Sequence, residues 1–244
     1  MQEHEVELHG LHQTVLNKIS TFPKGNILDV GAGKGEFAQK LVAIGYDVEA
    51  CDITPEPPWS RRLGVTYRQC DLNLGGLPFG DESFDYVVCI EVIEHIENPF
   101  ALCRELKRVL KHGGRAIIST PNILRFRSRI QFLLEGNYPW FDLPLIEWEQ
   151  QGGGAYVHIN PMRVHEMEYC LYKGGFEVEE FFANKRSYRG WPVLPLELAM
   201  RFLLWLKVKK SRRHGGPSVS RLYSLILTKD LLYGTHLIVC AKRP

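Results

Sequence analysis

A glycine-rich turn at residues 31–35 is the feature that most restricts how this chain can fold. The stretch LDVGAGKGEF places Gly31, Gly33 and Gly35 between an apolar segment and a segment with helical spacing. Glycine permits a tight turn from a strand into a helix and lets the backbone approach a ligand closely. The pattern therefore predicts a strand–turn–helix unit with a ligand at the turn.

The spacing of these glycines excludes two common phosphate-binding turns. The G-K-[ST] ending of a P-loop is missing, and the glycines do not follow the G-x-G-x-x-G spacing of dinucleotide enzymes. Asp29 stands two residues before Gly31, and a carboxylate at that place disfavours a pyrophosphate. The turn therefore suits a ligand that carries a cationic or amine group.

Strands and helices alternate along the chain. Helical spacing at residues 34–44 and 98–114 separates apolar segments, and the later part of the chain is less regular. This order predicts an α/β fold with a doubly wound, Rossmann-like and mostly parallel seven-stranded sheet, with helical insertions before and after the sixth strand. The predicted strands are residues 26–33, 47–52, 65–71, 83–92, 115–122, 175–184 and 235–243.

Length and composition are consistent with a single domain over residues 1–244. Hydrophobic residues make up 45% of the chain and charged residues 24%, which allows a substantial core. The net charge of +2 is too small to indicate a nucleic-acid partner. The six cysteines form no C-x-x-C pair, which favours a reducing, cytoplasmic compartment over a disulfide framework or a zinc site. Residues 122–160 and 186–233 are expected to form a cap on the substrate side.

Five motifs in order resemble the class I S-adenosylmethionine-dependent methyltransferases. The resemblance runs from about residue 25 to residue 122 and implies the fold described above with S-adenosylmethionine as cofactor. It is carried by Asp29 with the three glycines, by Asp52, by CDL at residues 70–72, by LPFGDESFDYVVCIEVIEHIENP at residues 77–99, and by LKRVLKHGGRAIISTPN at residues 106–122.

The resemblance also implies roles for individual residues toward the cofactor. Asp52 ends the second predicted strand, 19 residues after Gly33, where its carboxylate would accept hydrogen bonds from the ribose hydroxyls. Asp71 and Leu72 correspond to the family's adenine contacts, and Glu91 borders the methionine end of the cofactor and the acceptor pocket. The expected cofactor-binding residues are Asp29, Gly31, Gly33, Gly35, Asp52, Asp71, Leu72 and Glu91.

Glu91, Glu94 and His95 follow directly after the fourth predicted strand and permit three interpretations. His95 can act as a general base toward an acceptor hydroxyl, because imidazole titrates near neutral pH. The three residues can instead bind a divalent metal with His158, an arrangement that resembles the small-RNA 3′-end methyltransferases. They can also form a structural turn. We expect His95 and His158 to be catalytic, and we assign no residue to a metal.

Residues 194–213 combine a strongly apolar helical pattern with a basic end. The chain contains no acidic residue from Ala199 to Thr228, but it has several lysines and arginines there. Such a segment is typical of a helix at a membrane surface, a lid over an apolar substrate, an RNA contact, or a helix packed on the sheet with a solvated basic end. We expect a peripheral membrane contact through residues 194–213, at the inner face of a membrane.

The motifs EVIEHIENP, STPN and HINP resemble the ubiquinone-type and related small-molecule O-methyltransferases. The expected function is therefore S-adenosylmethionine-dependent O-methylation of a small-molecule acceptor of lipid or sugar type, without a nucleic-acid partner. Two alternatives remain. One is a metal-assisted RNA ribose 2′-O-methyltransferase, and the other is an inactive cofactor-binding module at a membrane or partner surface.

Overall fold

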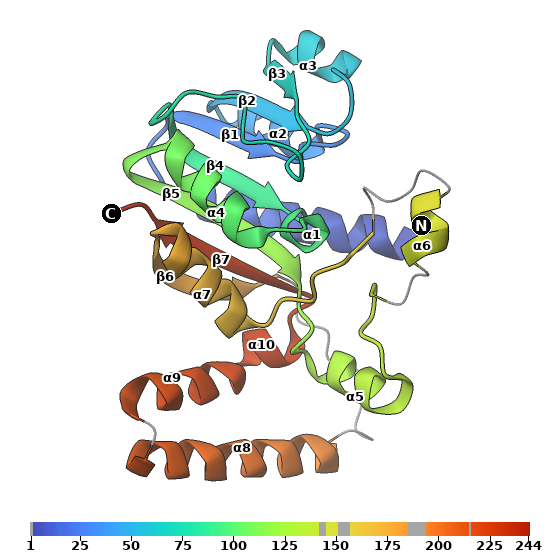
Figure 1. The fold of residues 1–244 in the computed structure, drawn as a ribbon, viewed down its shortest axis with the longest axis vertical. Coiled ribbons are helices and arrows are strands. Elements are labelled where there is room, and N and C mark those ends of the chain that lie inside the picture. Colours follow the sequence, from blue (N-terminus) through green and yellow to red (C-terminus); the bar gives the residue numbers. More distant parts are fainter. Residues whose placement is uncertain (1, 142–144, 151–156, 185–193, 215) are drawn as a thin grey trace.

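The protein contains one twisted sheet with helices on both faces (Figure 1). The computed structural model describes residues 2–141, 145–150, 157–184, 194–214 and 216–244. The strand order is β3-β2-β1-β4-β5-β7-β6, in which only β7 runs antiparallel to its neighbours. The predicted seven-stranded, mostly parallel sheet is thereby confirmed. The strands are β1 Asn26–Val30, β2 Asp47–Asp52, β3 Thr66–Gln69, β4 Phe84–Ile90, β5 Leu110–Pro121, β6 Glu177–Ala183 and β7 His236–Lys242.

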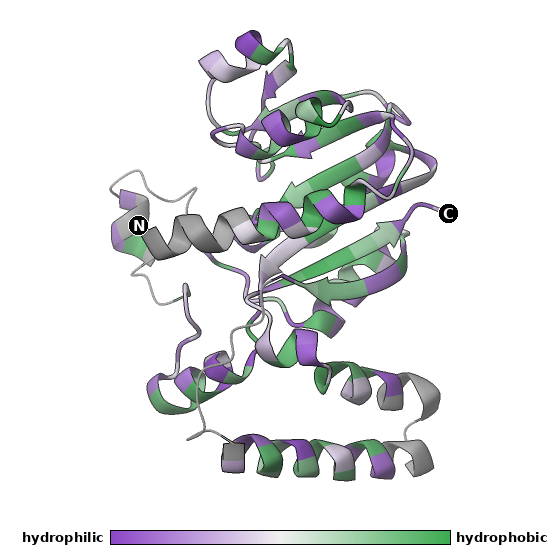
Figure 2. Ribbon diagram, turned by 180° about the vertical axis from the view of Figure 1, so that it is seen from behind, coloured by the Kyte–Doolittle hydropathy of each residue, from purple (hydrophilic) through white to green (hydrophobic). Residues whose placement is uncertain are grey.

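Helices cover both faces of the sheet, and a hydrophobic core lies between the sheet and the helices on each face. Helices α4 and α7 pack on one face, and α1 and α2 pack on the other. Figure 2 shows α1 crossing the back of a sheet whose strands are mostly hydrophobic. The helices are α1 Gln2–Ile19, α2 Glu36–Ala43, α3 Pro58–Leu63, η1 Ile93–His95, α4 Pro99–Val109, α5 Phe126–Glu135, α6 Leu145–Gln150, α7 Val164–Gly174, α8 Leu194–His214, α9 Gly216–Ile226 and α10 Lys229–Tyr233.

The central strands β1 and β4 define where a ligand can bind. Strand β4 is nearly continuous in apolar residues and is buried on both faces, as expected of a parallel strand covered by two helical layers. In the sheet, β2 lies next to β1 on one side and β4 lies next to β1 on the other side, so the strand order reverses between β1 and β4. In open α/β sheets, such a reversal of strand order opens a crevice at the carboxyl ends of the strands.

The helix predicted over residues 98–114 ends earlier than expected. Asn98 caps α4 by accepting a hydrogen bond from the Ala101 N–H, and the helix ends at Val109. Leu110 then lies opposite Phe84 in the sheet, so the segment through Gly114 belongs to β5 instead. The prediction of a helix up to Gly114 was wrong because apolar residues at 109 and 110 fit the end of a helix and the start of a buried strand equally well.

The two long connections contain helices. Helices α5, α6 and α7 lie between β5 and β6, and α8, α9 and α10 lie between β6 and β7. Helices α8 and α9 pack against each other, on the far side of α10 from the sheet (Figures 1 and 2). The parts of the expected cap at residues 142–144, 151–156, 186–193 and 215 lie outside the described residues. Among the described helices, none is both long and apolar enough to cross a membrane.

Candidate functional site

The glycine turn between β1 and α2 needs glycine for two distinct reasons. Gly31, Gly33 and Gly35 have φ angles of 75°, 48° and 74°, a region that side chains rarely adopt. A Cβ atom would lie 2.2 Å from a methyl group of Val92 at Gly31 and 2.3 Å from the Trp59 ring at Gly35. At Gly33 the same atom would meet nothing within 4 Å. The first and third glycines therefore allow close packing, and Gly33 leaves backbone open to a ligand.

Asp52 lies at the end of β2 and faces the glycine turn. Its Oδ2 accepts a hydrogen bond from the Gly33 N–H at 2.9 Å, and its Oδ1 accepts one from the Thr54 N–H at 3.0 Å. The Trp59 Nε1–H donates to the Gly33 carbonyl at 3.1 Å and holds the other side of the turn. Each oxygen of Asp52 retains a lone pair for a ligand hydroxyl. Trp59, which follows two prolines after β2, has no motif around it that predicts this role.

Asp29 is a buried carboxylate next to the turn. Its Oδ2 accepts no hydrogen bond from the residues that the structure describes. Burial, and then the charge of Asp52, raises the pKa of Asp29 to about 7, while a hydrogen bond from the Ala38 backbone opposes the shift. A buried acceptor without a donor is costly unless a ligand supplies one. The amine or sulfonium of S-adenosylmethionine has the charge that fits this acceptor.

Asp71 and Leu72 continue the same edge of the sheet beyond β3. The Cys70 N–H donates to the Asp52 carbonyl at 2.8 Å, which places this segment beside the end of β2. The Asp71 Oδ1 accepts from the Asn73 N–H at 2.9 Å, and Leu72 packs on the core below. The structure therefore brings Asp52, Asp71 and Leu72 to neighbouring positions at one edge, as the resemblance implied.

Glu91 immediately follows β4 and adopts an unusual backbone conformation, with a φ of 54°. The Ser119 Oγ–H donates to the Glu91 Oε1 at 2.7 Å, and the Ser119 Oγ accepts from the Glu91 N–H at 3.1 Å. Burial raises the pKa of Glu91 to about 8, although the Ser119 hydrogen bond lowers it. A positive φ at a non-glycine residue stores strain that the surrounding contacts must offset, which is common at functional sites.

His236 is a polar neighbour of Glu91 that the sequence analysis missed. Its Nε2 lies 3.4 Å from the Glu91 Oε2, and its Nδ1 lies 2.8 Å from the Asn184 Nδ2. The imidazole of His236 stacks on the Trp140 ring with 5.8 Å between the centroids. The guanidinium carbon of Arg125 lies 4.7 Å from the centroid of the same Trp140 ring. His236 is the first residue of β7, and only the antiparallel pairing of β7 with β5 brings it beside Glu91.

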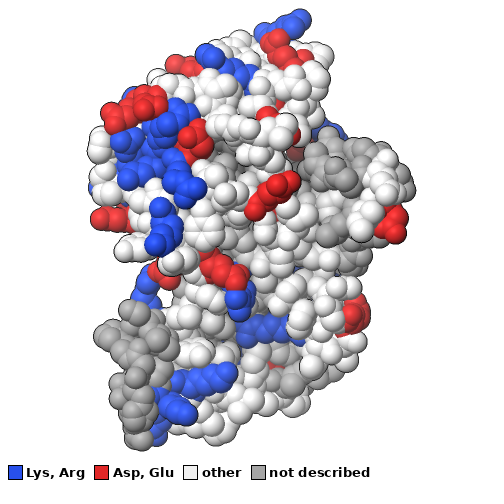
Figure 3. Space-filling view, viewed as in Figure 1, with Lys and Arg blue, Asp and Glu red and all other residues white. Residues whose placement is uncertain are grey.

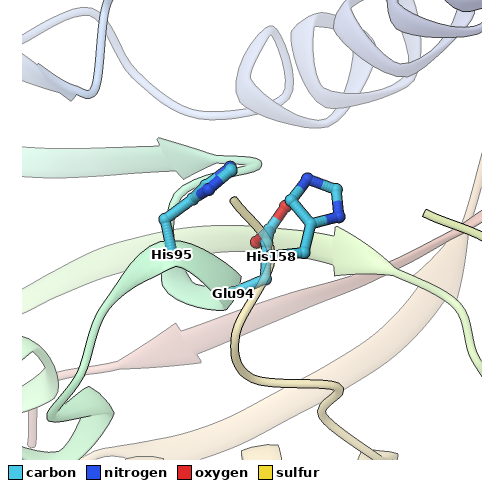
Figure 4. Close-up of side chains that lie close together, drawn as sticks. All are labelled: Glu94, His95 and His158. Atoms are coloured by element: carbon cyan, nitrogen blue, oxygen red, sulfur yellow. The ribbon is translucent and has the colours of Figure 1, made fainter. Parts of the chain in front are cut away.

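His95 and His158 meet although they are 63 positions apart. Their ring centroids lie 4.6 Å apart with an interplanar angle of 73°. The backbone N–H groups of Ile159 and Asn160 donate to the Glu94 carbonyl at 2.8 and 2.9 Å, so the segment carrying His158 is fixed to η1. Figure 4 shows both imidazoles close to the Glu94 carboxylate, near the end of β4.

The hydrogen bonds of His95 determine which of its ring nitrogens is available. The Nδ1 lies 3.0 Å from the carbonyl oxygen of Val157, which can only accept. The Nδ1 therefore carries the proton, and the Nε2 of the neutral ring holds a lone pair. Burial lowers the pKa of His95, and the hydrogen bond to Val157 opposes that shift. The imidazole is consequently neutral at pH 7 and able to accept a proton.

Glu94 lies beneath the two histidines and is fully buried. Its two carboxylate oxygens make no well-formed hydrogen bond to any residue that the structure describes. Burial, followed by the charge of Glu91, raises the pKa of Glu94 well above its ordinary value. Without a positive neighbour, burial therefore disfavours the ionised form of this carboxyl group.

Glu94, His95 and His158 also form a candidate cation site. One ligand atom from each residue lies within 4.8 Å of the other two. Donor atoms bound to the same ion at about 2.1 Å are at most about 4.2 Å apart, so binding would need small side-chain rotations. Two imidazoles and a carboxylate form a donor set that suits zinc and similar divalent ions.

Comparison with known proteins supports this interpretation of the fold. Residues 28–118 match a family described as "Methyltransferase domain". A ubiquinone biosynthesis O-methyltransferase from Xanthomonas oryzae pv. oryzae is 35% identical over 126 residues, which are 47% of this chain and 52% of that protein. The protein of the same name from Rickettsia conorii is 30% identical over 170 residues, which are 67% of this chain and 55% of that protein.

The match to these curated relatives covers about half of their length. A solved SAM-dependent methyltransferase from Thermotoga maritima aligns over 100% of this chain and 96% of its own, with a TM-score of 0.56 and 17% identity. The domain match covers the segment that carries the glycine turn, Asp52 and Glu91. The chain therefore contains a methyltransferase domain and has the fold of the class I S-adenosylmethionine-dependent methyltransferases.

Proposed function

We propose that the protein transfers the methyl group of S-adenosylmethionine to a hydroxyl group of a small-molecule acceptor. The observation that carries this proposal is the meeting of His95 and His158 beside Glu94, just after β4, at the edge of the sheet where the neighbouring strand β1 leads into the glycine turn. The relatives named ubiquinone biosynthesis O-methyltransferase support a hydroxyl acceptor over an amine. A nucleic-acid acceptor is not part of the proposal.

The residues around the glycine turn hold the cofactor in this proposal. Asp52 accepts hydrogen bonds from the ribose hydroxyls, and Asp71 with Leu72 contacts the adenine. Asp29 accepts from the amine of the methionine part, since its Oδ2 is buried and lacks a donor in the described chain. When bound, S-adenosylmethionine supplies a methyl group that is activated by the positive charge on its sulfur.

The chain contributes position and proton transfer. The neutral His95 accepts the proton of the acceptor hydroxyl at Nε2, because Nδ1 is occupied by the Val157 carbonyl. His158 packs edge-on against His95 and forms the next part of the acceptor pocket wall. Holding the two reactants in line and away from water supplies most of the remaining acceleration.

Two variants test the assignment of the base. Calorimetry with S-adenosylhomocysteine measures cofactor binding, and transfer of radiolabelled methyl groups to a panel of phenols, catechols and hydroxylated alkyl chains measures turnover. His95→Ala is expected to lower kcat by about 10²–10⁴-fold and to leave cofactor affinity within about twofold. His112→Ala removes an exposed histidine and serves as the control. Unchanged kcat in His95→Ala would refute His95 as the base, and unchanged kcat in His158→Ala as well would exclude both histidines from that role. Cofactor binding without turnover on any acceptor would favour the inactive module.

A divalent cation at Glu94, His95 and His158 is a second way to deprotonate the acceptor, favoured by the clustering of their ligand atoms. A bound cation would lower the pKa of a coordinated hydroxyl and would let Glu94 ionise. Turnover after chelation with EDTA distinguishes the two mechanisms. Activity that is lost with EDTA and restored by Mg²⁺, Mn²⁺ or Zn²⁺ supports the cation, whereas unchanged activity supports His95 as the base.

The peripheral membrane contact expected of residues 194–213 is a separate proposal, and it depends on the surface of α8 rather than on the methyl-transfer site.

A further inference from the structure

The outer face of α8 is an apolar surface that the rest of the described chain leaves open. Its inner stripe, which includes the buried Val208, packs along α9. The outer residues are 42–59% exposed and, at 100° per residue, lie within about 160° of the helix circumference. A helix that is apolar on both faces is normally buried on both faces. The exposed residues are Leu198, Phe202, Leu203, Trp205 and Leu206.

Helix α5 adds to this apolar surface near the start of α8. The Arg129 Nη1 lies 3.1 Å from the Met200 Sδ, which places the two helices in contact. The last turn of α5 exposes Phe132, Leu133 and Leu134, and about three quarters of each of these two leucines is accessible. Helices α5 and α8 lie at the same end of the molecule, away from the sheet (Figure 1), so these exposed side chains belong to one end of the protein.

Basic side chains accompany the apolar face and acidic ones do not. No acidic residue occurs between Ala199 and Thr228. Lys207, Lys209 and Lys210 form no ion pair with any residue that the structure describes, and the Lys209 Nζ lies 5.2 Å above the Trp205 ring. Figure 3 shows Lys and Arg side chains at the lower left, over the C-terminal end of α8. Lys209 and Lys210 project from the same half of the helix as the apolar residues.

We propose that α8 docks the protein on the surface of an anionic lipid bilayer. A helix lying in the bilayer interface inserts its apolar face by about 5–10 Å, while lysine side chains reach the phosphate groups. Trp205 has the amphipathic ring that is enriched at this depth. A second copy of the chain carries the same positive surface, so the charge favours an anionic bilayer over self-association.

Cosedimentation of the full chain with vesicles tests this proposal. One vesicle population contains phosphatidylcholine alone, and the other contains phosphatidylcholine mixed with phosphatidylglycerol. The double variant Phe202→Glu/Trp205→Glu places charge on the apolar face, at two side chains that are about half exposed. Leu74→Glu is the matched control, because Leu74 is 87% exposed and lies between β3 and β4. Melting temperature and S-adenosylhomocysteine binding establish that each variant is folded.

The unchanged protein is expected to bind the anionic vesicles at least tenfold more tightly than the neutral ones. The double variant is expected to lose at least tenfold, and Leu74→Glu to lose nothing. Replacing Lys207, Lys209 and Lys210 by Gln is expected to weaken anionic binding about 100-fold, since each basic residue near the surface contributes about fivefold.

Two results would overturn the proposal. The first is equal vesicle binding by the double variant and the Leu74→Glu control. The second is an absence of vesicle binding together with a dimer, detected by light scattering without lipid, that the double variant dissociates. The second result would assign the apolar face to a contact between copies of the chain.

Discussion

Replacing Asp29 by Asn is expected to stabilise the cofactor-free protein at neutral and alkaline pH. Burial and the charge of Asp52 raise the pKa of Asp29 from 3.8 to about 7 in the folded state. A carboxyl group with a raised folded pKa contributes stability fully below its unfolded pKa and loses that contribution as the pH rises through the folded pKa. The free energy of unfolding should therefore decline between about pH 4 and pH 7 because of this one group.

The size of the effect follows from the shift. A difference of about 3 pKa units at about 1.4 kcal/mol each corresponds to roughly 4 kcal/mol above pH 7. Roughly 3 kcal/mol of this develops between pH 5 and pH 8. Asparagine has the shape of aspartate without the charge, so the free energy of unfolding of the variant, relative to the original chain, should rise by this amount over that range.

Urea unfolding followed at several pH values measures the difference directly. Asp47→Asn is the matched control, because Asp47 is exposed at the start of β2. A difference for Asp29→Asn that is constant from pH 5 to pH 8 would refute the assigned pKa and its physical cause. Asp29→Asn is also expected to bind S-adenosylhomocysteine more weakly than the original chain. A residue that serves binding often lowers the stability of the free protein, so its replacement can raise stability and weaken binding together.

Two further predictions concern the site. Because burial lowers the pKa of His95 below 6.5, kcat/KM is expected to fall on the acid side with a midpoint below 6.5, and a midpoint above 7 would contradict His95 as the base. Gly33→Ala and Gly64→Ala should each lower the free energy of unfolding by about 1 kcal/mol, since both glycines have positive φ and open space at Cβ. Only Gly33→Ala should also weaken cofactor binding, by tenfold or more in calorimetry; equal effects of the two variants on binding would remove Gly33 from the cofactor site.

The sheet and the cofactor side of the site could be predicted because their signals are local. A strand that is buried on both faces requires a continuous apolar run, as in β4, and a tight turn requires glycines, as at Gly31 and Gly35. Asp29 and Asp52 lie at or near the ends of apolar strands, so their positions at the edge of the sheet can be predicted from the neighbouring residues alone. The spacing of these residues therefore contains most of the information about where they meet.

The acceptor side could be predicted only in part, because it is assembled by contacts between distant segments. His95 and His158 were both expected to be catalytic, but no local pattern indicated the distance between them. That distance depends on the hydrogen bonds of residues 157–160 with η1 and His95. His236 was missed because an isolated histidine at the start of a strand has no distinctive neighbours. For the same reason, the end of α4 was misplaced: the turn at Gly113 is held by a hydrogen bond to the Arg243 carbonyl, 130 positions away.

Three carboxyl groups, of which Asp29 and Glu94 are buried and Glu91 is partly exposed, give the site a common electrostatic character. Burial raises the pKa of Asp29, Glu91 and Glu94, so each is disfavoured in its ionised form when no positive charge is near. A cationic ligand reverses this balance, because ionisation of the carboxyl groups then strengthens binding. An anionic ligand would meet the opposite response. Asp29, the carboxyl group before the glycine turn, is thus one of three acidic groups at the ends of the central strands whose raised pKa disfavours an anionic ligand such as a pyrophosphate and suits a cationic one such as a sulfonium.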